Sequence, residues 1–91
     1  MINLLIADDH NIFRAGLKRI LADTPDIRVG AEAGSGHEAL ELMRNQDWDV
    51  VVLDINLPGK SGLDVLKQIK MEKPDLPVLI LTLSEAEDDL A

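Results

Sequence analysis

The sequence predicts an α/β protein built on a doubly wound parallel sheet, because short apolar runs alternate along the chain with segments of helical periodicity. Two of these runs, Ile2–Ala7 and residues 49–54, are nearly continuous, which is typical of strands buried on both faces. Capping residues and helix-ending prolines separate the segments. With 91 residues, the chain is long enough for one domain at most.

The first strand, Ile2–Ala7, is followed by a helix that begins at Asn11 and ends near Pro25. The apolar residues of this helix recur at intervals of three and four: Phe13, Leu17, Ile20 and Leu21. A second, weaker strand covers Ile27–Ala33. Charged residues, Arg28 and Glu32, interrupt it, which favours a position at the edge of the sheet.

The second helix opens at Ser35, which forms a capping box with Glu38. After the buried strand at residues 49–54, a third helix follows Ser61 and ends before Pro74. Residues 77–83 form the fourth predicted strand.

A further capping box, Ser84 with Glu87, starts a fourth helix, but Ala91 is the last residue, barely two turns later. Three complete helices are few for a parallel sheet that needs cover on both faces. We therefore expect residues 1–91 to be the N-terminal part of a larger domain, truncated after the fourth strand and the start of the fourth helix.

Composition excludes several classes of function. Nine basic and 17 acidic residues give a formal charge of −8, and such a surface repels the phosphate backbone of nucleic acids. The chain has no cysteine, which excludes disulfides and thiolate zinc sites. No apolar run approaches the ~20 residues of a membrane span, and the N-terminus lacks the basic segment of a secretory signal. We expect a cytoplasmic domain that does not contact membranes.

Polar side chains follow the apolar strands where a ligand would bind, since open α/β sheets bind ligands beyond the carboxyl ends of their strands. Asp8 and Asp9 follow the first strand, Asp54 ends the third, and Thr82 ends the fourth. Oxygen ligands alone favour a hard cation, Mg²⁺ rather than zinc. A carboxylate there can also act as a nucleophile and form an aspartyl phosphate. Alternatively, Asp8 and Asp9 merely cap the first helix.

Three segments of the chain, residues 5–10, 52–62 and 80–82, resemble the receiver domain of bacterial two-component response regulators. The resemblance spans the whole chain and implies a flavodoxin-like sheet of order 2-1-3-4-5. The pair Asp9-His10, followed by residues 14–17, is similar to the subfamily that carries a LuxR-type helix-turn-helix output domain.

The resemblance implies a role for each candidate site residue. Asp54 would accept a phosphoryl group from a sensor histidine kinase. Asp8, Asp9 and Asp54 would bind Mg²⁺, with the backbone carbonyl of Asn56 as a further ligand. Thr82 would supply the switch hydroxyl that moves toward the phosphoryl oxygens. The domain would regulate rather than act as an enzyme, catalysing at most its own phosphoryl transfer and dephosphorylation, and a separate output domain would bind DNA.

The chain departs from the family pattern after the fourth strand. The family carries a lysine at the end of a fifth strand, whereas no lysine follows Lys73 here. The resemblance thus implies that the fifth strand, the fifth helix and any output domain are absent from this chain. Residues 78–83 would then form an uncovered edge, and we expect self-association by strand or helix exchange.

Two other functions remain open: a phosphorylation-independent interaction or dimerisation module, and a nucleotide-binding fragment. The second rests on the glycine pattern of residues 34–39, which follows a strand and opens a helix. We interpret His10 and His37 as surface residues, since neither has an evident partner. Phe13 is expected in the core, and Trp48 is expected to shield the start of the third strand.

Overall fold

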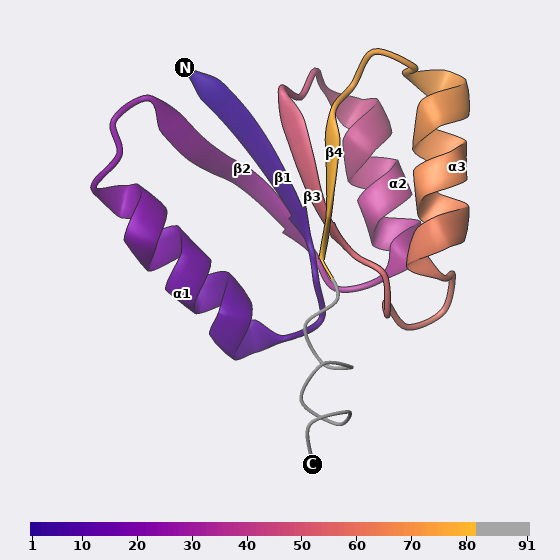
Figure 1. Ribbon diagram of the computed structural model, residues 1–91, viewed down its shortest axis with the longest axis horizontal. Coiled ribbons are helices and arrows are strands. Elements are labelled where there is room, and N and C mark those ends of the chain that lie inside the picture. The colour runs from indigo at the N-terminus through magenta and orange to yellow at the C-terminus, as the bar shows by residue number, and fades with distance from the viewer. Residues whose placement is uncertain (82–91) are drawn as a thin grey trace.

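Every helix and strand predicted up to residue 81 is present. The computed structural model describes residues 1–81, and within them the chain alternates strictly between strand and helix (Figure 1). The elements are β1 (Ile2–Ala7), α1 (Asn11–Ala22), β2 (Ile27–Ala33), α2 (Gly36–Asn45), β3 (Val50–Asp54), α3 (Gly62–Glu72) and β4 (Val78–Leu81). The predicted helix that follows Ser84, and residues 82 and 83 of the predicted fourth strand, lie outside the described residues.

The strands form one parallel sheet of order β2-β1-β3-β4. This order confirms the doubly wound prediction and places the charge-interrupted β2 at an edge. The sheet reverses its direction of growth between β1 and β3, and this is where open α/β sheets bind ligands. Ala7 of β1 pairs with Leu53 of β3, so the residues that follow them leave the sheet at the same level.

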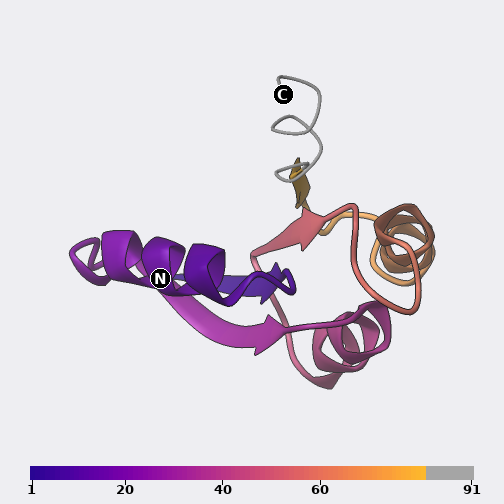
Figure 2. The ribbon, with the colours of Figure 1, turned by 90° about the horizontal axis from the view of Figure 1, so that it is seen from below.

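The helices lie on the two faces of the sheet, with α1 on one face and α2 and α3 on the other (Figure 2). The larger core lies under α2 and α3. Its buried members are Leu5, Ala7, Ala33, Ala39, Leu40, Met43, Trp48, Val51, Leu53, Leu57, Val65, Ile69 and Leu76. Alternate residues of β1 and β3 face α1, where Leu4, Ile6 and Val52 pack near Leu17 and Leu21. This alternation explains why both strands read as continuous apolar runs.

The helix caps predicted at Ser35 and Ser61 are formed, and the cap predicted at Ser84 lies outside the described residues. Ser35 Oγ accepts a hydrogen bond from the amide of Glu38 at 3.2 Å, and Ser61 Oγ does the same for Asp64 at 3.2 Å. The reciprocal half of the first box differs from the prediction, because Glu38 Oε1 accepts from the amide of Gly34 rather than of Ser35. Each cap stabilises its helix by about 1 kcal/mol and fixes where the preceding loop ends.

Of the predictions made for the two aromatic residues, one is confirmed and one is wrong. Trp48 is buried just before β3, as predicted: its Nε1 donates to the Leu42 carbonyl at 2.9 Å. The core assignment of Phe13 is wrong, since this residue is half-buried. It lines an open apolar hollow of about 330 Å³ together with Ile2, Leu4, Leu17, Leu21, Ile27, Val50, Val52, Leu79 and Leu81. Helix α1 packs over β2, which leaves the β3–β4 side of that face uncovered within the described residues.

No helix among residues 1–81 combines the length and apolar character needed to cross a membrane.

Candidate functional site

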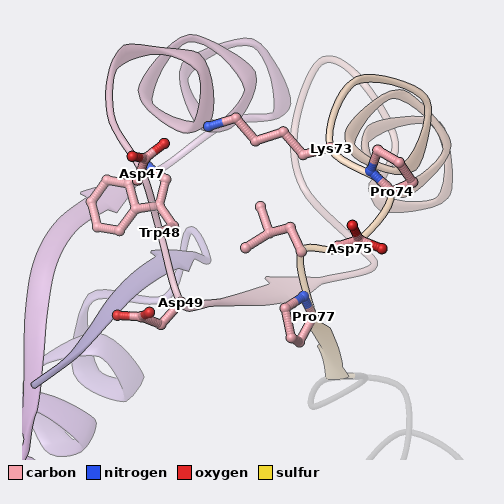
Figure 3. A pocket seen from close by; sticks show the side chains of 8 residues that line it. Asp47, Trp48, Asp49, Lys73, Pro74, Asp75 and Pro77 are labelled. Atoms are coloured by element: carbon pink, nitrogen blue, oxygen red, sulfur yellow. The ribbon is translucent and has the colours of Figure 1, made fainter.

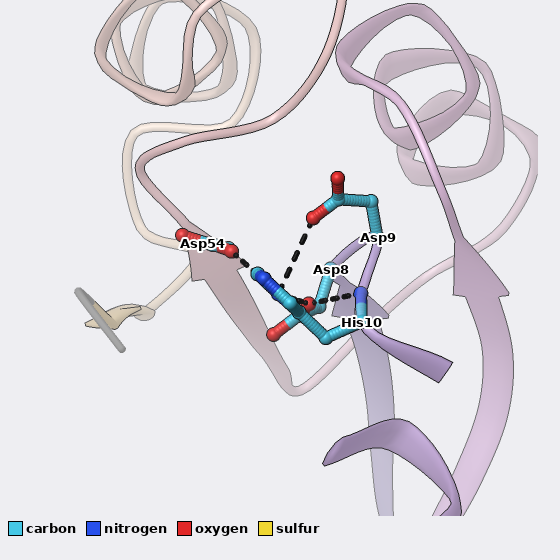
Figure 4. A group of neighbouring side chains, drawn as sticks. All are labelled: Asp8, Asp9, His10 and Asp54. Carbon is cyan, nitrogen blue, oxygen red and sulfur yellow. Dashed lines mark hydrogen bonds and ion pairs between the residues drawn. The ribbon is translucent and has the colours of Figure 1, made fainter. Parts of the chain in front are cut away.

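Three carboxylates meet at the carboxyl ends of β1 and β3, as the sequence predicts (Figure 4). Asp8 follows β1 directly and Asp54 is the last residue of β3, and both are fully buried (0% exposed). Asp9 is on the outer side of the group, with 39% of its side chain exposed. The register of β1 and β3, in which Ala7 pairs with Leu53, brings Asp8 and Asp54 together.

Each buried carboxylate has one oxygen in a hydrogen bond and one without a partner. Asp8 Oδ1 accepts from the amide of His10 at 2.7 Å, and Asp54 Oδ1 accepts from the amide of Asn56 at 3.0 Å. Asp8 Oδ2 and Asp54 Oδ2 are buried and have no hydrogen-bond partner among the described residues. Like charges this close disfavour ionisation unless a cation joins them. The arrangement therefore fits a bound cation.

His10 belongs to this site. It is exposed, as predicted, but the prediction that it has no partner is wrong. Its Nδ1 lies 2.7 Å from Asp8 Oδ1, 3.3 Å from Asp9 Oδ1 and 3.4 Å from Asp54 Oδ2. The hydrogen bond to Asp8 raises the pKa of the His10 imidazole, and the charges of the three carboxylates add to this effect. His37 is exposed, as predicted, and does not belong to the cluster.

The position of His10 follows from its local backbone. His10 is the N-cap residue of α1 and has extended dihedral angles, φ −91° and ψ 101°. Its amide closes a two-residue turn on the Asp8 side chain, as Asp commonly does ahead of a helix. This turn holds the ring over the ends of β1 and β3, and the Asp-x-His spacing was the one sequence signal that could have indicated it.

The simple capping interpretation of Asp8 and Asp9 is not supported. A capping carboxylate accepts from an amide in the first helical turn. Asp8 instead bonds to His10, the residue before that turn, and the first turn of α1 contains no acidic residue.

The backbone after Asp54 is held in place by several hydrogen bonds. The Ile55 amide donates to the Leu81 carbonyl at 3.1 Å, and the Gly62 amide donates to the Ile55 carbonyl at 3.0 Å. Asn56, the expected carbonyl ligand, is exposed, and its amide bond to Asp54 fixes it beside the site. Thr82 lies outside the described residues, but its neighbour in the chain, Leu81, pairs with Asp54 across β3 and β4.

The glycine pattern at residues 34–39 leaves no space for a nucleotide phosphate. A Cβ atom on Gly36 would lie 2.6 Å from the Lys60 carbonyl oxygen and 2.9 Å from a methyl of Val65. The loop before α3 thus covers the start of α2, and Glu38 already binds the Gly34 amide. Gly36 thus serves the close packing of the start of α2 against this loop.

A hollow of about 490 Å³ lies at the opposite, N-terminal edge of the sheet (Figure 3). Several of its polar groups have structural partners. Lys73 Nζ donates to the carbonyls of Met43 at 2.7 Å and Gln46 at 3.0 Å, and Asp49 Oδ2 accepts from the amide of Asn3 at 2.6 Å. This hollow joins loops rather than gathering unpaired reactive groups, so the carboxylate cluster is the candidate site.

Comparison with known proteins gives a consistent result. The profile of the response regulator receiver domain matches residues 4–91. The nitrate/nitrite response regulator protein NarP of Escherichia coli K12 is 39% identical over 87 residues, which cover 96% of this chain and 40% of NarP. The chain spans about 36–41% of the length of the curated relatives it matches.

Solved structures agree with these sequence relatives. A LuxR-family two-component response regulator from Aurantimonas sp. SI85-9A1 is 32% identical with a TM-score of 0.83, covering 97% of this chain and 64% of that chain. A chain in the crystal structure of histidine kinase ThkA in complex with response regulator TrrA is 34% identical with a TM-score of 0.81, covering 91% of this chain and 70% of that one.

Proposed function

The chain belongs to the response regulator receiver domain family, and on that basis we propose that Asp54 accepts a phosphoryl group from a sensor histidine kinase. The single observation that carries this proposal is the buried Oδ2 atom of Asp54, which has no hydrogen-bond partner within residues 1–81. In the transfer, this oxygen forms a bond to phosphorus while the bond between phosphorus and the kinase histidine nitrogen breaks.

Asp8, Asp9 and Asp54 would hold Mg²⁺, with the Asn56 carbonyl as a further ligand. The two unpaired buried oxygens, Asp8 Oδ2 and Asp54 Oδ2, support a cation at this position. When bound, Mg²⁺ offsets the charge that develops on the phosphoryl oxygens during transfer. The protein's own residues supply the cluster of carboxylate oxygens. The register of β1 and β3 places these residues side by side.

Thr82 would supply the hydroxyl that responds to phosphorylation. The pairing of Leu81 with Asp54 supports this assignment, because it brings the described end of β4 level with the proposed phosphoacceptor. Replacement of Thr82 by Ala should leave phosphoryl uptake intact and weaken the conformational response to it.

The 91 residues would be the N-terminal part of a receiver domain in a cytoplasmic transcription regulator. The relatives' greater length supports an output domain elsewhere in the protein, and any DNA contact would belong to that domain. The net charge of −8 is consistent with this division, since the receiver part itself repels nucleic acid.

Self-association is a second activity that one specific observation favours. The open apolar hollow beside β4 includes Leu79, which is 56% exposed. In a second copy of the chain, an equivalent strand or helix would cover this surface, as edge strands without charges allow. A phosphorylation-independent dimerisation module would use this surface and leave the carboxylates without a role.

Acetyl phosphate with Mg²⁺ tests the proposal in the protein that contains these residues. Mass spectrometry should find one added phosphoryl group on Asp54 in the wild type and none in Asp54→Asn, because the amide is not a carboxylate nucleophile. Asp64→Asn is the matched control, since Asp64 is an exposed carboxylate outside the cluster. Uptake that persists in Asp54→Asn would place the acceptor elsewhere.

A further inference from the structure

The ring of His10 is placed as a metal ligand would be. Its Nδ1 lies 2.7, 3.3 and 3.4 Å from one oxygen each of Asp8, Asp9 and Asp54 (Figure 4). One donor atom from each of the four residues lies within 4.8 Å of all the others. Around an ion with bonds of about 2.0–2.1 Å, adjacent ligands lie about 2.8–3.4 Å apart in octahedral or tetrahedral geometry. The three nitrogen–oxygen distances are close to that spacing.

An independent observation indicates that this group binds a ligand. Asp54 is fully buried, and its Oδ2 atom, directed at the His10 ring, has no hydrogen-bond partner among the described residues. Asp8 Oδ2 is unpaired in the same way. Buried charged oxygens are costly unless a donor or a metal ion satisfies them.

We propose that His10 is a further protein ligand of the cation site, beside the three carboxylates and the Asn56 carbonyl, and that it shifts the site's preference toward transition-metal ions such as Co²⁺ and Zn²⁺. This inference rests on the proposed function, since it uses the same three carboxylates. Mg²⁺ selects oxygen ligands, whereas imidazole suits borderline transition metals. One nitrogen, added to three carboxylates and the Asn56 carbonyl, therefore makes a donor set that discriminates between the two kinds of ion.

Ligation requires that Nδ1 lose its proton. A carboxylate can only accept, so the 2.7 Å contact with Asp8 Oδ1 places the proton on Nδ1. For Nδ1 to bind a metal, its proton leaves and Nε2 carries the ring hydrogen. The side chain is 43% exposed, so water can exchange this proton without opening the core.

Affinities for Co²⁺ and Mg²⁺, measured by calorimetric titration, test this assignment. His10→Asn should lower Co²⁺ affinity by at least about tenfold, because even an outer partner of a metal ligand is worth about 10–100-fold. Mg²⁺ affinity should not show a comparable loss, since the Asn oxygen suits a hard ion. Asn is also a favourable N-cap residue, so α1 should be retained. His37→Asn, which changes the exposed histidine of α2, should alter neither affinity.

Either of two outcomes would overturn the inference. A rise in Co²⁺ affinity in His10→Asn would show that the ring occupies the cation's place and competes with it. An equal loss for both ions would reduce His10 to a structural role.

A spectroscopic measurement reports on ligation in the wild type directly. In the Co²⁺-loaded protein, the proton NMR spectrum should contain strongly shifted histidine ring resonances, which persist in His37→Asn and vanish in His10→Asn. Co²⁺ binding without these resonances would refute ligation by His10 and leave the proposed Mg²⁺ site intact. Failure of both ions to bind would refute the proposed cation site as well.

Discussion

Gly62 lies directly against Ile55, the residue that follows the proposed phosphoacceptor. The Gly62 amide donates to the Ile55 carbonyl at 3.0 Å, and a Cβ atom on Gly62 would lie 2.4 Å from the Ile55 Cα. The same Cβ would lie 2.6 Å from the carbonyl oxygen of Asp54. The start of α3 therefore holds the backbone after β3 in position by contact that only glycine allows.

Gly62→Ala should accordingly destabilise the fold by about 1–3 kcal/mol, the usual cost of forcing an extra group into a packed site. The backbone of Asp54 would have to shift, so phosphoryl uptake should fall in the variant. Urea unfolding gives the free energy, and mass spectrometry after treatment with acetyl phosphate gives the uptake.

Gly16→Ala provides a control of opposite sign. Gly16 is inside α1, and a Cβ atom there would meet nothing within 4 Å. Alanine should stabilise that helix by about 0.5–1 kcal/mol. If both variants changed stability in the same direction, close packing at Gly62 would not be the reason for its effect.

The sheet and the carboxylates could be predicted because each depends on a short stretch of sequence. β1 and β3 are buried on both faces, so their apolar runs are continuous, and the carboxyl ends of parallel strands meet at one edge. Asp8 and Asp54 are brought together by the pairing of Ala7 with Leu53. The prediction that Asp8 and Asp54 meet needed only the assumption that β1 and β3 are neighbours in the sheet.

The contacts of His10 and the exposure of Phe13 could not be predicted in the same way. The direction of the His10 ring depends on the extended backbone of an N-cap residue, which periodicity does not report. Phe13 has correct helical spacing, but helical spacing does not show how far across the sheet a helix reaches. α1 has no fully buried residue, and Ile20, on the same predicted stripe, is 71% exposed.

Mg²⁺ should raise the melting temperature of the protein that contains this chain. An ion that binds only the folded state adds RT ln(1 + [L]/Kd), about 2.7 kcal/mol at 100 times Kd. Asp9→Asn should reduce this gain, because it removes one charge from the proposed hard-ion site. Differential scanning calorimetry with and without Mg²⁺ measures the effect, with Asp64→Asn as control. If Mg²⁺ left the melting temperature unchanged in the wild type and in every variant, coordination by these carboxylates would be contradicted.

Acid should weaken the contact between α2 and α3 in a defined pH range. Arg44 donates to Glu72 at 2.7 Å and 2.5 Å, and these bonds, with a third from Gln68, lower the pKa of Glu72 to about 2. Because the folded pKa lies below the ordinary 4.5, ionised Glu72 stabilises the fold above pH 4.5, and this stabilisation is lost as pH falls toward 2.

Arg44→Gln should therefore return the pKa of Glu72 toward 4.5. The part of the acid-induced loss of stability that comes from Glu72 should then largely disappear. Carbon NMR of the Glu72 carboxyl group gives the pKa, and urea unfolding at several pH values gives the stability. Arg19→Gln, which removes the same charge from α1, should leave the pKa of Glu72 unchanged. If Glu72 still titrates near 2 in Arg44→Gln, the ion pair is not the cause.

The 91-residue chain should self-associate at micromolar concentration. β4 is an edge strand of the sheet described by residues 1–81, and its residues Val78–Leu81 carry no charge that would oppose pairing with another chain. Leu79, 56% exposed, borders the open apolar hollow, and burying one such side chain stabilises a complex by up to about 1.5–3 kcal/mol.

Leu79→Lys should shift the chain toward monomer in sedimentation velocity, because it places a charge on both the edge and the hollow. Met71→Lys makes the same change at an exposed apolar residue of α3 on the other face and should leave association unaffected. A wild-type chain that sediments as a compact monomer would show that neither the edge of β4 nor the hollow recruits a second copy.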